Sequence, residues 1–292
     1  MKPGLYLLIG AVSVSFAAIF IRLADAPPLI IAAYRIGIAS LIILPFTWKK
    51  VVYAVRTISK NTFGLLVLAG VFLSAHFYWW ITSLEYTTVA SSVVLVTANP
   101  IFIGLASYLL WKEKLGRRSI LGIMVAIAGV VVINFDKVSF SSEAFYGNML
   151  ALVAGLMAGG YLLIARVLRD KINAIAYLSL VYAISAVILV ISAIVSGLEF
   201  TGYSTQTFLM FILLAIIPQI LGHSSFNLAA RLMSVTLVSI AILGEPVGAT
   251  ILGILILGEQ PAIQEIIGGV VILLGIYLVL NRKTEPQALV DN

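Results

Sequence analysis

A few ionisable side chains interrupt the long apolar runs of this 292-residue chain, and they are its candidates for chemistry. The most informative is Glu245, which directly precedes Pro246 inside one such run. A carboxylate at the centre of a bilayer costs several kcal/mol unless it is paired, protonated or hydrated, and a carboxyl held there can carry a proton. We therefore predict that Glu245 is a proton-coupling residue. The alternative is a structural role, in which its carboxyl bonds to backbone groups and fixes the helix.

Two histidines, one in each half of the chain, lie in polar stripes with helical spacing. The stripes are His76, Trp79/Trp80 and Ser83 in the first half, and Gln219, His223 and Asn227 in the second. A neutral imidazole donates and accepts hydrogen bonds and titrates near physiological pH. One buried histidine is usually a packing residue, but two in matching stripes favour a binding site.

Two prolines inside apolar runs are candidate helix breaks. Pro100, which follows Asn99, and Pro246 lack the amide donor that a helix interior needs, and each frees carbonyls on the preceding turn. A membrane span tolerates this where protein or a water-filled cavity satisfies the freed groups. The breaks either shape a binding site or only kink their helices. The predicted substrate-binding residues are His76, Trp79, Asn99, Tyr161, Gln219, His223 and Asn227.

Some of these side chains have a second interpretation. Trp79 and its aromatic neighbours either offer a stacking surface to a solute or belong to the aromatic belt at a membrane interface. Arg35 lies within an apolar run and either pairs with a carboxylate or extends to the membrane surface.

The composition excludes most soluble classes. Hydrophobic residues make up 62% of the chain and charged residues 10%, whereas a soluble domain is about half apolar and about a quarter charged. The chain has no cysteine, which excludes thiolate metal sites, iron–sulfur clusters and redox pairs. It also has no phosphate-binding G-x-x-x-x-G-K-[ST] loop and no G-x-S-x-G or H-E-x-x-H motif. We therefore expect no enzyme, no cofactor and no metal.

Apolar runs between charged or turn-forming residues predict ten membrane-spanning helices. They lie at 5–23, 29–47, 63–83, 88–110, 119–135, 147–166, 173–196, 207–229, 232–257 and 263–280. Each run is too long for a strand and is apolar on all sides, as helices inside a membrane are. The first run is longer than the apolar part of a signal peptide, so we expect it to be retained. The predicted fold class is an all-α polytopic membrane protein.

The basic residues are distributed unevenly between the loops. With the N-terminus inside, the inner side holds Lys2, Lys49, Lys50, Arg56, Lys60, Lys112, Lys114, Arg117, Arg118, Arg166, Arg169, Lys171, Arg231, Arg282 and Lys283. Because Lys and Arg accumulate in cytoplasmic loops, we expect an inner-membrane protein with both termini in the cytoplasm. The segment 48–60 is expected to lie along the inner membrane surface. The net charge of +6 then reflects topology and does not indicate a nucleic-acid partner.

The chain matches itself at an offset of 146 residues without a gap. Pro100, Glu113, Gly122 and Gly129 align with Pro246, Glu259, Gly268 and Gly275. Each unit contains five spans, an odd number, so that the two copies are inverted relative to each other across the membrane. The basic residues of the inner loop between the fourth and fifth spans have no basic counterparts in the outer loop between the ninth and tenth, which agrees with inversion. We predict two inverted five-helix repeats, at 1–140 and 141–292.

Several short motifs carry a resemblance to a known family. They are Ala32-Ala33-Tyr34-Arg35, the stretch from Ala90 to Pro100 followed by Trp111-Lys112-Glu113, and Ser234-Val235-Thr236 leading to Gly244-Glu245-Pro246 and Leu257-Gly258-Glu259. With them the chain resembles the drug/metabolite transporter (DMT) superfamily, in particular its ten-helix EamA-type transporters, over nearly its whole length. The resemblance implies an exporter of amino acids, related metabolites or drugs. It also marks Glu113 and Glu259 as family positions, which we interpret as helix caps or gate contacts.

Together these features predict a secondary-active transporter that exports small metabolites such as amino acids by alternating access, with proton coupling. The alternatives are an uncoupled facilitator or exchanger and a drug efflux protein. A membrane-embedded lipid enzyme is less favoured because the polar groups gather at mid-depth, and a receptor or scaffold because the loops are minimal. The expected partners are a small-molecule substrate, protons and membrane lipids, and the expected assembly is a monomer or homodimer.

Overall fold

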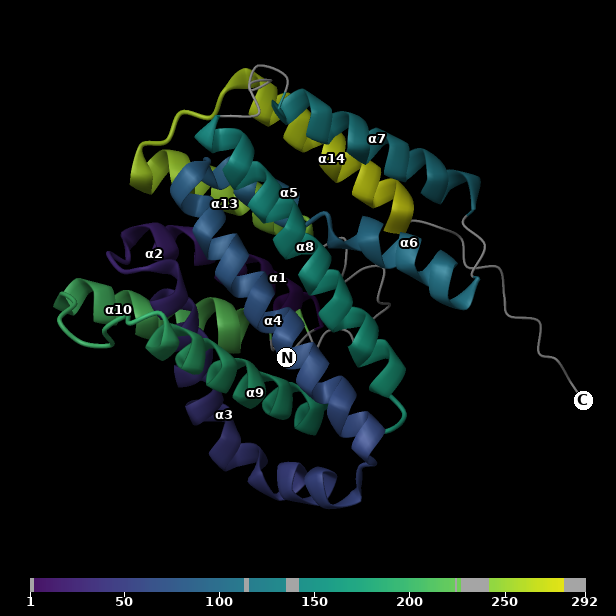
Figure 1. Ribbon diagram of the computed structural model, residues 1–292. Coiled ribbons are helices and arrows are strands. Elements are labelled where there is room, and N and C mark those ends of the chain that lie inside the picture. The colour runs from purple at the N-terminus through teal and green to yellow at the C-terminus, as the bar shows by residue number, and fades with distance from the viewer. Residues whose placement is uncertain (1–2, 113–115, 135–141, 224, 227–241, 281–292) are drawn as a thin grey trace, which may run out of the picture.

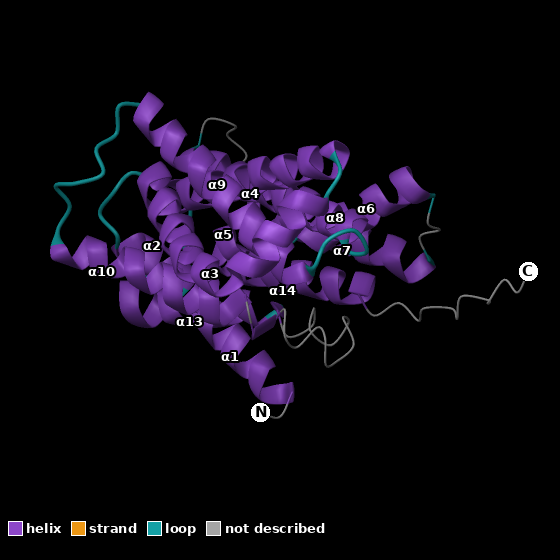
Figure 2. Ribbon diagram, turned by 90° about the horizontal axis from the view of Figure 1, so that it is seen from below, coloured by secondary structure: helices purple, strands orange, loops and turns teal. Residues whose placement is uncertain are grey.

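The computed structural model describes residues 3–112, 116–134, 142–223, 225–226 and 242–280. Every regular element within these ranges is a helix (Figure 2). Seven helical segments are long and apolar enough to cross a membrane, and the described residues add two shorter apolar helices, Gly244–Leu257 and Ile263–Leu278. The prediction of an all-α polytopic membrane protein is therefore confirmed.

The helices follow one another with short connections. In chain order they are α1 (Pro3–Ser15), α2 (Ala17–Leu23), α3 (Pro28–Thr57), α4 (Lys60–Tyr86), α5 (Val89–Val96), α6 (Asn99–Trp111), α7 (Arg117–Asn134), α8 (Glu143–Leu168), α9 (Ala174–Val195), α10 (Thr205–Leu214), the π-helix Ala215–His223, α13 (Gly244–Leu257) and α14 (Ile263–Leu280). The predicted spans at 5–23 and 88–110 each consist of two helices. The first part of the predicted span at 232–257 lies outside the described residues.

Helix α3 is longer than the span predicted at 29–47. It continues through Pro45 to Thr57, and Figure 1 shows its last turns running at a steep angle to its first part. A proline in a helix interior removes one hydrogen bond and bends the helix. The segment expected along the membrane surface is thus mostly the bent continuation of α3.

Short polar side chains define where several helices begin. The side chains of Ser59, Thr88, Ser142, Asn173 and Ser204 each accept a hydrogen bond from a backbone amide two or three residues further on. Such N-caps satisfy amides that the first helical turn leaves without partners. The connections between spans are short because these residues start the next helix at once.

The helix bounds repeat at the offset found in the sequence. α7 and α14 begin and end 146 residues apart, and α3 and α9 begin 146 residues apart. Lys112 and Gly258, which are also 146 residues apart, both have left-handed backbone, with φ of 54° and 66°. A residue other than glycine rarely adopts positive φ. Its presence at matching positions supports the repeat of one structural unit.

The equivalent helices α7 and α14 pack directly against each other (Figure 1). A Cβ added to Gly129 would lie 2.8 Å from the Gly268 carbonyl oxygen, and one added to Gly275 would lie 2.6 Å from that of Gly122. The helices therefore run antiparallel. Because Gly122 corresponds to Gly268 and Gly129 to Gly275, one contact is made twice, as a two-fold axis between the helices requires. This is the relation expected of inverted repeats.

Two apolar cores hold the helices together. The main core is built chiefly from α2, α3, α4, α9 and α10, and a smaller one lies among α5, α6, α7, α8 and α14. α4 packs along α8 and α9, and α1 packs against both the π-helix and α13. These contacts bring the polar residues of α3, α4, α9, the π-helix and α13 into one region.

We expect Gly129→Ala to lower the free energy of unfolding by about 1–3 kcal/mol, as overpacking of a close contact does. The new Cβ would meet backbone atoms of Gly268 and Ile272 at 2.8 Å, and these cannot move aside by a side-chain rotation. Thermal unfolding of the purified protein in detergent measures the effect. Gly64→Ala in α4, where a Cβ meets nothing within 4 Å, is the matched control. Equal stability of the two variants would contradict the close contact of α7 and α14.

Candidate functional site

The π-helix carries two of the predicted binding residues, Gln219 and His223. Pro218 lies inside it. A proline has no amide to donate, and its ring clashes with the carbonyl four residues earlier in an α-helix. π-helical turns are wider than α-helical turns and often occur at functional sites. In this segment Gln219 is 1% exposed, whereas the side chain of His223 is exposed.

Arg35 of α3 is buried, with 1% of its surface exposed. Its Nε donates to Oε1 of Gln219 at 2.9 Å, and Nε2 of Gln219 donates to the hydroxyl of Tyr182 in α9 at 2.5 Å. Hydrogen bonds from a charged donor are stronger than neutral ones. The interpretation that Arg35 extends to the membrane surface is therefore wrong. The side chain instead ties together three helical elements from both halves of the chain.

Two aromatic side chains of α4 cover the guanidinium group of Arg35. Its Cζ lies 4.4 Å from the ring centroid of Phe77 and 5.5 Å from that of Trp80, within the range of cation–π contacts. Nη1 of Arg35 and Nε1 of Trp80 are buried and have no hydrogen-bond partner in the described part of the chain. A buried donor without a partner costs about 1–3 kcal/mol, and more when it is charged. We call Arg35, Phe77, Trp80, Tyr182 and Gln219 the arginine cluster.

Three further ionisable side chains adjoin the arginine cluster. Electrostatic interactions connect Arg35 with Glu245, His76 and His223. Glu245 nevertheless forms no hydrogen bond or ion pair with another described residue. His76 and Glu245 are half-buried and His223 is exposed. All three lie near a buried arginine.

Two of the predicted residues, His76 and Tyr161, lie near the cluster. Nδ1 of His76 lies 3.0 Å from the carbonyl oxygen of Ala154 in α8. Because a carbonyl only accepts, Nδ1 carries the proton, and Nε2 is the acceptor of the neutral ring. The His76 ring also stacks on Trp80, with centroids 6.1 Å apart. Tyr161 interacts electrostatically with Tyr182, so both predicted residues belong to the surroundings of Arg35.

The two predicted helix breaks lie at equivalent places. α6 begins at Asn99 and has Pro100 as its second residue, and α13 begins at Gly244 with Pro246 in its first turn. A proline is accommodated there because first-turn amides have no intrahelical partner. In each repeat the residue before the proline, Asn99 or Glu245, therefore stands at the start of a helix.

The structure does not bring all predicted residues to the arginine cluster. Asn99 lies where α6 meets Gly159 of α8, and Trp79 is half-buried against the main apolar core. Asn227 lies outside the described residues, as does Glu113. Tyr182, the third member of the chain of hydrogen bonds from Arg35, was not among the predicted residues, although it lies between Ser179 and Ser185 at helical spacing on the buried face of α9. The available signal was Arg35 itself, since an arginine in an apolar run needs partners from other helices.

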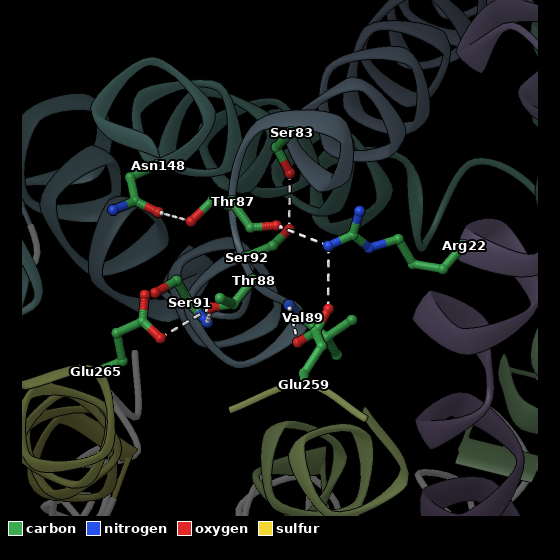
Figure 3. Close-up of polar contacts among 10 residues, drawn as sticks. All are labelled: Arg22, Ser83, Thr87, Thr88, Val89, Ser91, Ser92, Asn148, Glu259 and Glu265. Atoms are coloured by element: carbon green, nitrogen blue, oxygen red, sulfur yellow. Dashed lines mark hydrogen bonds and ion pairs between the residues drawn. The ribbon is translucent and has the colours of Figure 1, made fainter. Parts of the chain in front are cut away.

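A second polar cluster joins the two halves at the end of α4 (Figure 3). Nη2 of Arg22 pairs with Oε1 of Glu259 at 3.0 Å and also donates to the Thr87 carbonyl at 3.4 Å. The other oxygen of Glu259 accepts from the Val89 amide at 2.9 Å. Val89 is the first residue of α5, where free amides and the helix dipole favour a carboxylate. Glu259 is thus a helix cap, and the helix that it caps belongs to the other half.

Further hydrogen bonds extend this cluster (Figure 3). They run from the Thr88 hydroxyl to Glu265 (3.1 Å), from the Thr87 hydroxyl to Asn148 (2.7 Å) and between the hydroxyls of Ser83 and Ser92 (2.7 Å). We call Arg22, Thr87, Thr88, Val89, Asn148, Glu259 and Glu265 the inter-repeat cluster. It connects α2, α4 and α5 of the first half with α8, α13 and α14 of the second.

A basic hollow lies near the opposite end of α4. It is a cavity of about 350 Å³ whose lining includes Lys49, Lys50, Tyr53, Lys171 and Asn173. None of the predicted binding residues lines it. Its charge suits anionic groups at a membrane surface rather than a solute inside the helices.

Apolar spans, ionisable groups held among them and a polar cluster that ties two repeated halves define a polytopic membrane protein of the transporter class. The chain matches the EamA-like transporter family over residues 1–135 and again over 145–281, and it belongs to that family of membrane transporters. This confirms the resemblance to the DMT superfamily and the expectation that the protein is not an enzyme.

Relatives of this chain are also described as transporters. The chain is 28% identical over 257 residues to an uncharacterized transporter of Clostridium kluyveri, covering 86% of this chain and 82% of that protein. It is 27% identical over 241 residues to the uncharacterized transporter YetK of Bacillus subtilis, covering 78% and 71%. A solved crystal structure matches with a TM-score of 0.66 at 16% identity, over 95% of this chain and 96% of that one. That likeness supports the fold.

We expect Glu259→Ala to lower the free energy of unfolding by about 1–2 kcal/mol, because an N-cap contributes about 0.5–2 kcal/mol and an accessible ion pair about 0–1 kcal/mol. Glu259→Gln should cost less, since its amide oxygen still accepts from Val89. Melting temperatures in detergent rank the variants by stability. Asp170→Asn, which removes an exposed contact with Arg169, is the control and should have no effect. Equal melting temperatures for Glu259→Ala and wild type would exclude the capping role.

Proposed function

We propose that this EamA-family transporter is a secondary-active exporter of small metabolites such as amino acids. It works by alternating access and couples transport to protons through Glu245. The observation that carries the proposal is the inter-repeat cluster, in which side chains of one half hold the helix ends of the other. The substrate binds beside the arginine cluster.

The inter-repeat cluster supports a gate at one end of the substrate pathway. Inverted repeats allow a protein to exchange a pathway open at one face for one open at the other. The contacts of Glu259 with Arg22 and Val89 close the end where they form, and their separation opens it. Each of these contacts contributes only about 1–3 kcal/mol or less to stability. The free-energy differences between two conformations of one protein have a similar size. The uneven distribution of basic residues favours an orientation in which the inter-repeat cluster lies at the outer face of the membrane and both termini lie in the cytoplasm.

The side chains near Arg35 suit a small polar metabolite. His76, Tyr161, Gln219 and His223 offer hydrogen-bonding groups on three elements, beside the aromatic rings of α4. Trp79, Asn99 and Asn227 stay predictions as further lining residues. The mixture of a few polar groups with aromatic surface is typical of small-molecule sites.

Glu245 has the features expected of a coupling carboxyl. It stands at the start of α13, is half-buried, and is near enough to Arg35 to interact without bonding to it. A carboxyl without a fixed partner can bind a proton in one state and substrate in another. A charged carboxyl inside a membrane is costly, and binding a proton removes that cost.

Other functions lead to different measurements. If Glu245 is structural, the protein is an uncoupled facilitator or exchanger. The aromatic side chains Phe77 and Trp80 would also suit an apolar drug. Transport of radiolabelled amino acids and of cationic dyes in proteoliposomes, with and without a pH gradient, separates these possibilities.

We expect Glu245→Gln to abolish substrate accumulation driven by a pH gradient, because the amide binds no proton, while the melting temperature stays near that of wild type. Uptake into proteoliposomes measures it, and Glu199→Gln in an exposed loop is the control. Wild-type accumulation in Glu245→Gln would exclude the coupling role. Wild-type transport that ignores the gradient would favour the facilitator.

We expect a disulfide across the inter-repeat cluster to stop transport. A Cβ added to Gly253 in α13 would lie 3.5 Å from the Val89 Cβ in α5, a separation that a disulfide spans. The chain has no native cysteine, so Val89→Cys combined with Gly253→Cys forms the one possible intramolecular pair. Oxidation should inhibit transport and a reductant should restore it.

Each single cysteine variant is the control and should not respond to oxidant. Gel mobility after alkylation measures how much of the disulfide has formed. Full transport by a completely crosslinked protein would show that the two halves need not separate at this end.

A further inference from the structure

We propose that Arg35 and Trp80 bind the carboxylate group of the substrate, so that the site selects small carboxylates and suits α-amino acids in particular. This inference rests on the proposed transport function and names the chemical class of its cargo. It is carried by two buried donors that the described part of the chain leaves without partners.

The first donor is the guanidinium group of Arg35. Its Nε is occupied by Gln219, and its Nη1 is buried and has no hydrogen-bond partner in the described residues. A guanidinium group is a planar fork of donors that fits the two oxygens of a carboxylate. Nη1 therefore remains available for an oxygen that the described part of the chain does not supply.

The second donor is the indole Nε1 of Trp80, which is likewise buried and unpartnered within the described chain. The Trp80 ring lies 5.5 Å from the Cζ of Arg35. An indole nitrogen only donates. Both donors lack an acceptor, and they belong to neighbouring side chains of α3 and α4. They are therefore suited to one group that carries two acceptor oxygens.

The orientation of Arg35 is fixed before any ligand binds. Gln219 is itself buried and bonded to Tyr182, and the Phe77 ring lies 4.4 Å from the Arg35 Cζ. A group held in this way loses little further freedom on binding. A ligand carboxylate would also remove the cost of leaving the two donors unpaired.

Glu245 supplies the opposite charge. It interacts electrostatically with Arg35, and no ion pair joins them. An α-amino acid, whose ammonium and carboxylate groups are close together, can face both residues at once. An amine without a carboxylate would leave Arg35 unpaired and meet its repulsion, so the arrangement also disfavours cationic compounds.

The test measures binding directly, without vesicles. Thermal unfolding of the purified protein is followed with each proteinogenic L-amino acid at millimolar concentration, and with the corresponding amides, which lack the carboxylate charge. Wild type should be stabilised by a subset of the acids and much less by their amides. The concentration for half-maximal stabilisation then serves as the measure of affinity.

Two variants locate the carboxylate site. Trp80→Phe keeps an aromatic ring and removes one donor, so it should weaken binding of the stabilising acid about tenfold. Arg35→Lys keeps the charge but removes the fork, and should weaken it about 10- to 100-fold. Trp48→Phe and Arg169→Lys, both at exposed positions, are the matched controls and should bind as wild type does.

Several results would overturn the inference: acids and amides that stabilise equally, no stabilisation by any acid, or unchanged affinity in Trp80→Phe. If Arg35→Lys fails to fold, Trp80→Phe still decides. Carboxylate-selective binding without transport in proteoliposomes would contradict only the proposed function. Transport of small metabolites that lack a carboxylate, without carboxylate binding, would contradict only this inference.

Discussion

A guanidinium group among membrane-spanning helices has to be held by other helices, because lipid offers it no hydrogen bonds and a charge is costly in an apolar medium. Arg35 meets this requirement through Gln219, Tyr182 and the rings of α4. Its partners come from α4, α9 and the π-helix, so satisfying one side chain draws elements of both halves to one place. The positions of the two histidines and of Glu245 around it follow from that convergence.

The two halves are alike where helix backbones are in close contact, and they differ at the polar residues around Arg35. The glycines of α7 and α14 recur in both repeats because each must admit the opposite backbone. At the 146-residue offset Arg35 corresponds to Val181, and Glu245 corresponds to Asn99. Close packing constrains both copies equally, whereas Arg35 and Glu245 each occur in one copy alone. The framework is therefore repeated, and the proposed site is not.

The two polar clusters differ in how firmly they are held. The arginine cluster is buried and its charge is fixed by hydrogen bonds and aromatic rings. In the inter-repeat cluster the side chains of Arg22 and Glu259 are 33% and 13% exposed, and water can replace their contacts. A rigid centre combined with a more easily broken end agrees with the proposed cycle, in which the gate changes while the binding groups keep their geometry.

Hydropathy and spacing were sufficient for the fold class and for the offset of the repeat, and short motifs for the family, since each depends on the order of residues along one helix or on their recurrence. The interruptions beside Pro100 and Pro246 could be predicted for the same reason. The partners of Arg35 could not, because a helical stripe tells which residues share a face but not which other helix that face meets. Arg22 and Glu259, 237 residues apart, met only through the packing of the two halves. Long-range contacts between polar side chains depend on how helices are placed in three dimensions, and that placement is set by the tertiary structure alone.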